Sequence, residues 1–259
     1  MTPARALLAA LHCAKGDPRH NLRMHEQHLG LAAEQGCDIA VFPEMSLTGS
    51  CDPRAPGSGL PLEAPGVLAL ARATARHGVA ALFGLAERSP GGVHITQVFA
   101  RGGAVAGHYR KRHLGEDEDH FVPGGAPALF GLDGVPFGGA ICAEGGADYP
   151  FDEPAAAGAP VVFLCAAPGR YGRRTDEASW RRGWEWWLGH GLRQAVRHAS
   201  RLGIWVAVAT QSGATVDEDF PGLAALVDPS GTVVATTPDW REGALVVEIP
   251  VERGRGRTP

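Results

Sequence analysis

The sequence predicts an α/β fold in which mixed β-sheets are covered by helices. Three observations support this prediction. In the first part of the chain, short apolar runs typical of strands alternate with longer stretches of helical periodicity. Later in the chain, glycine-containing turns separate pairs of apolar runs, as in antiparallel hairpins. The chain has 259 residues, of which 44% are hydrophobic, so it can bury a large core.

Four stretches are predicted to be helices. Residues 21–34 have apolar side chains at helical spacing, with Asn21 as the expected N-cap and Gly36 as the expected stop. Residues 65–77 are rich in alanine and are followed by Gly78. The two other predicted helices are residues 151–157 and 177–202.

The predicted strands are apolar runs bounded by turn residues. Two of the turns are strong hairpin signals, Arg101-Gly102-Gly103 and Pro229-Ser230-Gly231. The predicted strands are residues 6–14, 37–42, 79–86, 93–100, 104–110, 128–132, 135–142, 160–166, 204–210, 223–228, 232–237 and 243–249.

Composition limits the classes of protein to consider. No linker divides the chain, so we expect a single domain over residues 1–250, followed by a flexible tail over residues 251–259. A formal net charge of -4 argues against nucleic acid as a partner. No apolar run reaches the roughly 18 residues of a membrane span. The apolar stretch near the start is expected to be a core strand rather than a signal peptide.

The cysteines and histidines do not predict a disulfide framework or a metal site. There are 5 cysteines and no CxxC pair, which favours free thiols and a cytoplasmic location. Cys13, Cys37 and Cys165 lie in apolar runs and are expected in the core. His20, His25 and His28 are close in sequence, but we expect His25 and His28 to face outward from their helix.

Three residues form a candidate catalytic set. Cys142 ends an apolar run and is followed by a glycine-rich turn, which presents a thiol openly. Glu44 follows another predicted strand, and Lys111 lies in a basic segment at the end of a third. A carboxylate, an ammonium and a thiol at strand ends are suited to nucleophilic attack on an amide-like carbon.

The segments that carry these residues resemble the motifs of a known family. Residues 36–49 read GCDIAVFPEMSLTG, residues 109–114 read YRKRHL, and residues 139–142 read GAIC. Glu118, Phe121 and Pro123-Gly124 follow the second segment. In order and spacing, the segments are similar to the three catalytic motifs of the nitrilase superfamily, the carbon–nitrogen hydrolases. The resemblance covers nearly the whole chain.

The resemblance implies a fold and a set of roles. The fold is a four-layer αββα sandwich with two mixed sheets. Glu44 is expected to be the general base, Lys111 the electrostatic stabiliser and Cys142 the nucleophile of a thioester mechanism without metal or other cofactor. Glu118 resembles a second family glutamate that orients the lysine and substrate, although Glu116 offers an alternative register.

Physical chemistry supports these roles. A free thiol near pH 7 is mostly protonated and needs a base, which Glu44 can provide. Lys111 can stabilise the developing oxyanion, and one such donor is worth on the order of 3 kcal/mol. The backbone N–H of Ala143, directly after the nucleophile, is the expected second donor and substrate-binding group.

Three positions depart from the family pattern. Ala143 stands where an aromatic residue is usual, and Glu144 stands where aspartate is common. Ser50-Cys51 follows Gly49, where the family often has tyrosine. We therefore expect a roomier or more polar pocket, with Cys51 near it, and assign no subfamily.

Two further features have competing interpretations. Trp180, Trp184 and Trp187 share a predicted helix face, and core or dimer packing is favoured there over a ligand cage. The arginines of residues 168–177 are candidates for recognising a carboxylate on the substrate.

The sequence therefore predicts a hydrolase of non-peptide C–N bonds. Its partner would be a small amide or N-carbamoyl substrate, with release of ammonia or an amine, and the resemblance implies a homodimer or higher homo-oligomer. Two alternatives remain open: an acyltransferase that uses the same thioester, and a non-catalytic binding or scaffold protein with the same fold.

Overall fold

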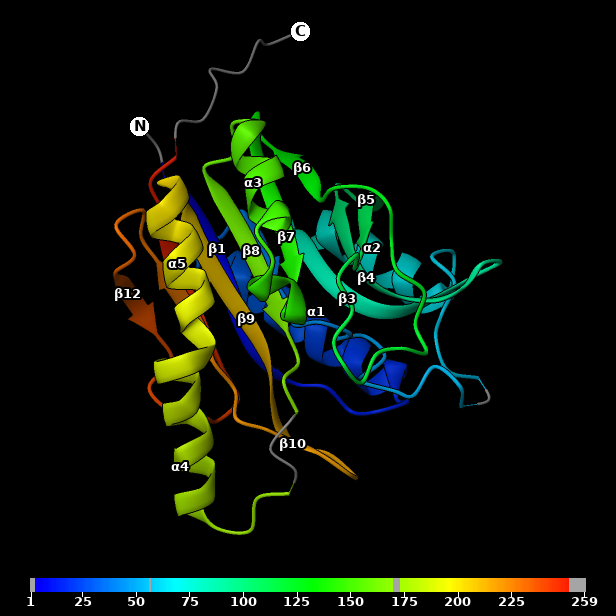
Figure 1. Cartoon of the computed structure of the whole chain (residues 1–259). Helices are drawn as coiled ribbons and strands as arrows, with labels where there is room; N and C mark the ends of the chain where they lie inside the picture. The colour runs from blue at the N-terminus through cyan, green and yellow to red at the C-terminus, as the bar shows by residue number, and fades with distance from the viewer. Residues whose placement is uncertain (1–2, 56, 170–172, 252–259) are drawn as a thin grey trace, which may run out of the picture.

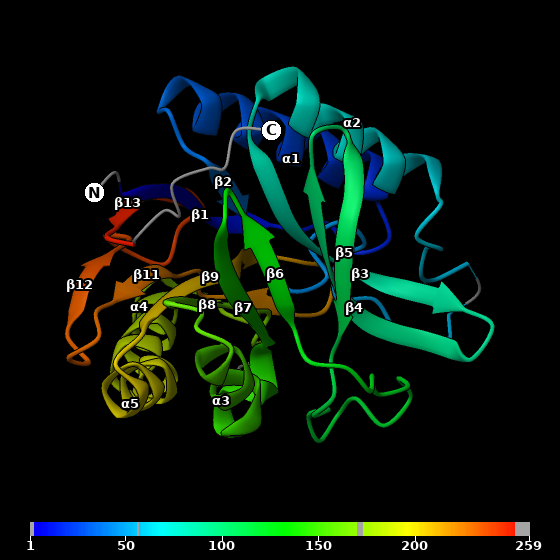
Figure 2. The ribbon, with the colours of Figure 1, turned by 90° about the horizontal axis from the view of Figure 1, so that it is seen from above.

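The computed structural model describes residues 3–55, 57–169 and 173–251. Two mixed sheets pack face to face, and helices cover both outer faces (Figure 1). Seen from above, α1 and α2 lie outside one sheet, while α3, α4 and α5 lie outside the other (Figure 2). The expected four-layer αββα sandwich is confirmed.

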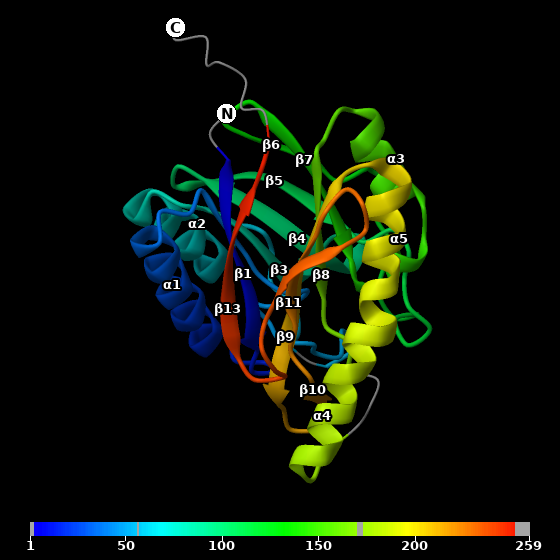
Figure 3. The ribbon, with the colours of Figure 1, turned by 90° about the vertical axis from the view of Figure 1, so that its left-hand side faces the viewer.

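The first sheet has the strand order β13-β1-β2-β3-β4-β5. Its strands are β1 (Ala4–His12), β2 (Ile39–Val41), β3 (Ala80–Ser89), β4 (Gly92–Arg101), β5 (Ala104–Arg110) and β13 (Gly243–Ile249). Strands β1, β2 and β3 are parallel, with Ala6 opposite Ile39 and Ile39 opposite Ala80. The other pairs are antiparallel, and β13 lies along β1 at one edge (Figure 3).

The second sheet has the order β12-β11-β9-β8-β7-β6. Its strands are β6 (Leu129–Leu132), β7 (Val135–Ile141), β8 (Val161–Ala166), β9 (Trp205–Ala214), β11 (Ala224–Val227) and β12 (Val233–Thr236). Strands β7, β8 and β9 are parallel. The short strand β10 (Asp219–Phe220) pairs antiparallel with the end of β9, and β1 pairs with β9 at Leu11 and Gln211.

Three apolar layers hold the sandwich together. One lies between the first sheet and helices α1 (Pro18–Glu34) and α2 (Pro65–His77). The second lies between the two sheets. The third packs the second sheet against α3 (Tyr149–Ala156) and α5 (Leu192–Leu202). Helix α4 (Glu177–Trp186) runs into α5 through a π-helical turn at Trp187–Gly191, within the single helix predicted there.

The tryptophan stripe serves core packing. Trp187 is buried in the third layer, and Trp184 packs against the same layer. Trp180 lies outside it, with the guanidinium of Arg174 6.0 Å from its ring centroid. The favoured interpretation of the stripe, packing rather than a ligand cage, therefore holds for two of its three members.

The start of α1 differs from the prediction. Asp17 is the N-cap and accepts a hydrogen bond from the backbone N–H of His20, and Pro18 occupies the first turn. Asn21 is fully buried instead, and its amide donates to the backbone oxygens of Ala14 and Leu47. The prediction that Asn21 caps the helix was therefore wrong. Its side chain instead connects two loops through hydrogen bonds.

His25 was wrongly expected to face outward. It is fully buried, with its Nδ1 2.7 Å from the backbone oxygen of Asn21 and its Nε2 2.9 Å from Ser46 Oγ. Its ring packs on Phe42, with centroids 4.3 Å apart. The buried face of α1 contains Asn21, His25 and Leu29 at four-residue intervals, so polar residues lie on the face that apolar spacing alone would assign to the core.

The last described residue, Val251, is packed in the core. Val251, which was assigned to the flexible tail, is buried between the sheets, and the remaining tail residues 252–259 lie outside the described residues. No helix in the described part of the chain is both long and apolar enough to cross a membrane.

His25 predicts an acid-sensitive stability. Burial lowers its pKa from the ordinary value of 6.5 to about 4, so the unfolded chain takes up the proton first as the pH falls. Its contribution to stability is complete above pH 6.5 and falls as the pH drops towards 4, by roughly 3 kcal/mol in total.

Denaturant unfolding between pH 7 and 4 should show a shallower pH dependence for His25→Gln than for wild type. The exposed-site variant His108→Gln should follow wild type, and identical slopes for all three proteins would contradict the prediction.

Candidate active site

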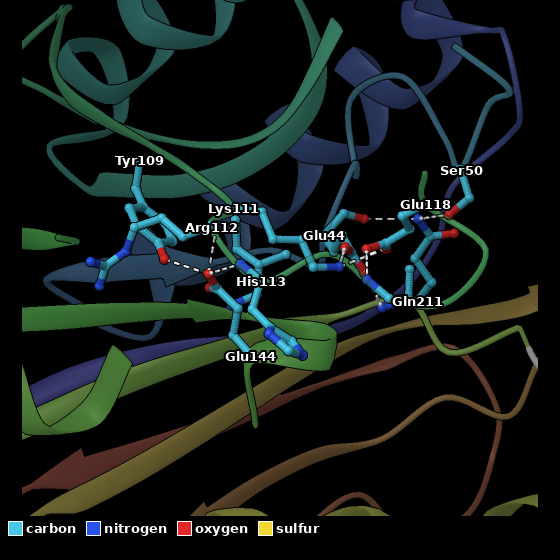
Figure 4. Close-up of polar contacts among 12 residues, drawn as sticks. Glu44, Ser50, Tyr109, Lys111, Arg112, His113, Glu118, Glu144 and Gln211 are labelled. Carbon is cyan, nitrogen blue, oxygen red and sulfur yellow. Dashed lines mark hydrogen bonds and ion pairs between the residues drawn. The ribbon is translucent and has the colours of Figure 1, made fainter. Parts of the chain in front are cut away.

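The catalytic set predicted from sequence comes together at one end of the sandwich. Glu44 lies in the loop after β2, Lys111 directly follows β5, and Cys142 directly follows β7. Two of these strands belong to the first sheet and one to the second. The side chains of Glu44, Lys111 and Glu118 converge on one another (Figure 4). The site is therefore assembled across the interface between the sheets.

The Glu44 carboxylate is buried and held at both oxygens. Its Oε1 accepts a hydrogen bond from Lys111 Nζ at 2.7 Å, and its Oε2 accepts one from the backbone N–H of Ala167 at 3.0 Å. The backbone oxygen of Glu44 accepts a bond from Gln211 Nε2 at 2.8 Å. Glu44 is thus held by the residue that follows β8 and by β9 of the second sheet, as well as by Lys111, which follows β5 of the first.

The loop of Glu44 has a tight turn that depends on β3. Met45 has a φ of 47°, in the left-handed region. Ser46 Oγ accepts a hydrogen bond from the backbone N–H of Gly84 at 3.1 Å and also meets buried His25. A Cβ at Gly84 would lie 2.3 Å from the backbone nitrogen of Met45 and 2.7 Å from the backbone oxygen of Pro43. Only glycine allows the loop to approach β3 this closely.

Lys111 is a fully buried ammonium between two carboxylates. Its Nζ donates to Glu44 at 2.7 Å and to Glu118 Oε1 at 2.6 Å. The other oxygen of Glu118 accepts a bond from the backbone N–H of Gly115 at 2.5 Å. Of the two registers left open by the sequence, the structure places Glu118 against the lysine.

The charges of Lys111 and Glu44 oppose the effect of burial on each other's pKa. Burial alone would lower the pKa of Lys111, but the charges of Glu44 and Glu118 raise it above its ordinary value. Burial also raises the pKa of Glu44, and the charge of Lys111 opposes that rise. The lysine therefore remains an ammonium, while Glu44 is a stronger base than an exposed glutamate.

Cys142 occupies the first position of a 3-10 turn, Cys142–Gly146, and has a φ of 44°. Burial raises the pKa of its thiol to about 12, and the charge of Glu44 adds to the rise while Lys111 opposes it. The thiol is therefore protonated near neutrality and needs a base to become a nucleophile. A hydrogen-bonding interaction with this thiol lowers the pKa of Glu44, so the carboxylate lies beside the thiol.

The turn after the nucleophile contains a contact that the sequence did not predict. Ala143 is half-buried and leads to Glu144, whose carboxylate is completely buried. Glu144 accepts hydrogen bonds from the backbone N–H groups of Ile141 and Arg112, at 2.9 and 2.8 Å (Figure 4). The only sequence signal was the departure from aspartate at this position.

Gln211 and Ala167 were also missed. Gln211 Nε2 donates to Ser50 Oγ at 3.0 Å as well as to the backbone oxygen of Glu44, and Ala167 supplies a backbone N–H to the Glu44 carboxylate. Both contacts with Glu44 form because the fold brings together strands that are distant in sequence. Since a backbone donor has no residue-type signature, Ala167 could not be found from sequence; Gln211 could be suspected only as a polar residue ending an apolar strand.

Other predicted neighbours have more limited roles. Cys51 and Cys142 pack against one apolar cluster, which includes Met45 and Ile141. The described arginines of residues 168–177 contact the protein itself: Arg173 donates to the backbone oxygen of Val216, and the backbone N–H of Arg174 donates to Asp219. Arg170 lies outside the described residues. Within the described ranges, no cluster of three or more His, Cys, Asp or Glu side chains could hold a metal ion.

Comparison with known proteins identifies the family. The sequence profile described as carbon-nitrogen hydrolase matches residues 7–257. The chain belongs to this family. Among curated relatives, the 2-oxoglutaramate amidase of Bacillus subtilis is 26% identical over 249 residues, which cover 92% of this chain and 87% of that protein. The glutamine-dependent NAD(+) synthetase of Xylella fastidiosa is 27% identical over 231 residues; the match covers 83% of this chain but only 38% of the synthetase.

An amidase from Nesterenkonia sp. is one of the solved structures with a similar fold. Its crystal structure superposes with a TM-score of 0.79 at 24% identity, covering 96% of this chain and 91% of that chain. A variant of the same amidase in complex with butyramide superposes with a TM-score of 0.80 at 23% identity, covering 96% and 92%. These likenesses show that the fold is shared.

The close approach at Gly84 predicts a strict requirement for glycine. In Gly84→Ala the new Cβ would push on the backbone of the Glu44 loop, and overpacking of this kind costs about 1–3 kcal/mol. Denaturant unfolding should show this loss. As the control, Gly66→Ala in α2 has nothing within 4 Å of its new Cβ and should be neutral or stabilising by up to about 1 kcal/mol. A Gly84→Ala protein as stable as Gly66→Ala would contradict the role assigned to this contact.

Proposed function

We propose that this carbon-nitrogen hydrolase cleaves small amides through a thioester on Cys142. The observation that supports this most strongly is the buried ammonium of Lys111, which is shared by Glu44 and Glu118 beside a thiol at a strand end. Burying a cation costs free energy even when two carboxylates compensate its charge, and this cost favours a functional role for Lys111. It is suited to stabilise negative charge that forms on a carbonyl oxygen.

The first half-reaction forms the thioester. Cys142 Sγ attacks the carbonyl carbon while Glu44 takes the thiol proton. The resulting oxyanion is stabilised by Lys111 Nζ and by the backbone N–H of Ala143. Glu44 then gives the proton to the amide nitrogen, the C–N bond breaks, and ammonia or an amine leaves.

The second half-reaction returns the enzyme to its starting state. Water attacks the thioester carbon while Glu44 takes one of its protons, and the same two donors stabilise the oxyanion. The C–S bond breaks, the carboxylic acid leaves, and the proton returns to the thiol of Cys142. Throughout, Glu118 keeps the Lys111 ammonium oriented, because it accepts a hydrogen bond from one of the three N–H groups of the ammonium.

A small amide is the substrate class that the relatives favour. One of them is named as a 2-oxoglutaramate amidase, and variants of the Nesterenkonia amidase are described in complex with butyramide and with acrylamide. In another variant, acrylamide has added to the active-site cysteine. An N-carbamoyl substrate and a homodimeric or higher homo-oligomeric assembly stay predictions of the family resemblance, and a cytoplasmic location stays a prediction of the cysteine content.

The covalent step can be tested by intact-protein mass spectrometry. Wild type is mixed with pooled short amides and N-carbamoyl amino acids and quenched in acid, and ammonia release is followed in parallel. We expect an acyl adduct on Cys142, no adduct in Cys142→Ala, and turnover lower by roughly 1000-fold in Glu44→Gln, since general base catalysis contributes on the order of 10²–10⁴.

Cys165→Ala is the matched control. The Cys165 thiol is also buried, and burial raises its pKa to about 12, but it lies within β8. This variant should keep the adduct and the ammonia release. An adduct that hydroxylamine intercepts much faster than water would instead favour acyl transfer. A wild-type protein that forms neither adduct nor ammonia with any compound of the pool would contradict the proposal and favour a scaffold.

A further inference from the structure

Glu144 is a completely buried carboxylate two residues after the nucleophile. Both of its oxygens are used. Oε2 accepts a hydrogen bond from the backbone N–H of Ile141 at 2.9 Å. Oε1 accepts from Tyr109 Oη at 2.5 Å, from the backbone N–H of Arg112 at 2.8 Å and from the backbone N–H of His113 at 3.3 Å (Figure 4).

This arrangement stabilises the charge by local dipoles. Moving a carboxylate out of water costs several kcal/mol unless hydrogen bonds replace its hydration. Hydrogen bonds to an ionised acceptor are roughly twice as strong as neutral ones, so four donors compensate for much of that cost. Replacing buried ionic groups by apolar side chains of similar volume is often neutral or stabilising, so stability alone does not account for a carboxylate at this position.

The donors come from two different parts of the site. Ile141 is the last residue of β7, immediately before Cys142. Arg112 and His113 immediately follow Lys111, and Tyr109 lies in β5. One carboxylate therefore ties the turn of the nucleophile, in the second sheet, to the segment of the catalytic ammonium, in the first.

The backbone of Cys142 needs such a constraint. Its φ of 44° lies in the left-handed region, which costs a residue with a side chain on the order of 1–2 kcal/mol. The bond from Ile141 N–H to the Glu144 carboxylate spans this residue and caps the N-terminus of the 3-10 turn. Loss of the bond would let Cys142 relax towards an ordinary conformation, and both the thiol and the N–H of Ala143 would move with it.

We propose that Glu144 is a positioning residue, whose carboxylate fixes the Cys142 thiol and the Ala143 N–H relative to the Lys111 ammonium. This inference rests on the proposed function for the roles of those three groups. Glu144 itself does not touch the substrate. Its effect should therefore appear in the chemical step and in the reactivity of the thiol, with little change in substrate binding.

Two variants weaken the contact to different degrees. Glu144→Gln keeps the size of the side chain but turns an NH₂ group towards N–H or O–H donors on at least one side. Tyr109→Phe removes one donor and leaves the backbone donors in place. The control is Glu153→Gln, which removes the ion pair of Arg112 on the outer side, at a carboxylate that is 40% exposed, and leaves Glu144 untouched.

The first readout is the rate at which iodoacetamide alkylates Cys142 in the folded protein, measured by peptide mass spectrometry. It needs no substrate. The second is the separation of kcat from KM on an amide that wild type hydrolyses. For Glu144→Gln we expect alkylation at least about tenfold slower and kcat lower by on the order of 100-fold, with KM within about threefold, because small misplacements of reacting groups have effects of this size.

Tyr109→Phe should show the same pattern at about three- to tenfold, and Glu153→Gln should match wild type. Glu144→Gln that folds and keeps the wild-type alkylation rate and kcat would overturn the proposal. If Glu144→Gln does not fold, Tyr109→Phe decides: a lower kcat at constant KM supports positioning, and wild-type values overturn it.

Failure of the proposed function has a different signature. If wild type hydrolyses no amide, the hydrolase proposal fails while the alkylation rates still test Glu144. Slower alkylation in Glu144→Gln then supports its role in placing the thiol, and unchanged alkylation overturns it.

Discussion

The rest of the site depends on the interaction of the buried Lys111 ammonium with the carboxylates of Glu44 and Glu118. Two carboxylates compensate its charge, and they lie in segments 67 and 7 residues away in sequence. Without the ammonium, Glu44 would be a buried and unpaired base, and its pKa would rise further because of burial. Without the carboxylates, burial would favour loss of the lysine's proton. The buried charges of Lys111 and Glu44 therefore compensate each other, and the partly exposed Glu118 adds a second negative charge beside the ammonium.

The fold meets the demands of this charge cluster with backbone donors and close packing. Ala167 N–H, at the end of β8, holds the second oxygen of Glu44, and Gln211 on β9 holds its backbone. Gly84 lets the Glu44 loop lie directly on β3. The two sheets therefore stabilise the sandwich and also position the Glu44 carboxylate, the Lys111 ammonium and the Cys142 thiol relative to one another.

The extent to which the sequence predicted this structure follows from the range of the interactions. Helix α2 and strand β5 were predicted with the observed bounds, because their periodicity and turn residues are local signals. Glu44, Lys111 and Cys142 were selected from their segments, and the structure brings the three segments to one end of the sandwich. The contact of Glu118 with the lysine needed the path of the loop, which a run of four acidic residues leaves ambiguous.

Contacts between distant segments could not be predicted in the same way. His25 is buried with a polar partner, Ser46, from a loop distant in sequence, so its burial could not be expected from its residue type. Glu144 was noticed only as an unusual residue, since its donors lie on a strand and a loop more than thirty residues earlier as well as on Ile141. Polar residues in the core are the ones whose environment is set by tertiary structure.

A crystal structure of Cys142→Ala with a short aliphatic amide bound would test the central claim most directly. If Lys111 is the group around which the site is built, the amide carbonyl oxygen will lie about 2.7–3.1 Å from its Nζ and from the backbone N–H of Ala143. The amide nitrogen will then face Glu44. An amide bound at this site with its carbonyl oxygen out of hydrogen-bonding reach of Lys111 would contradict the account.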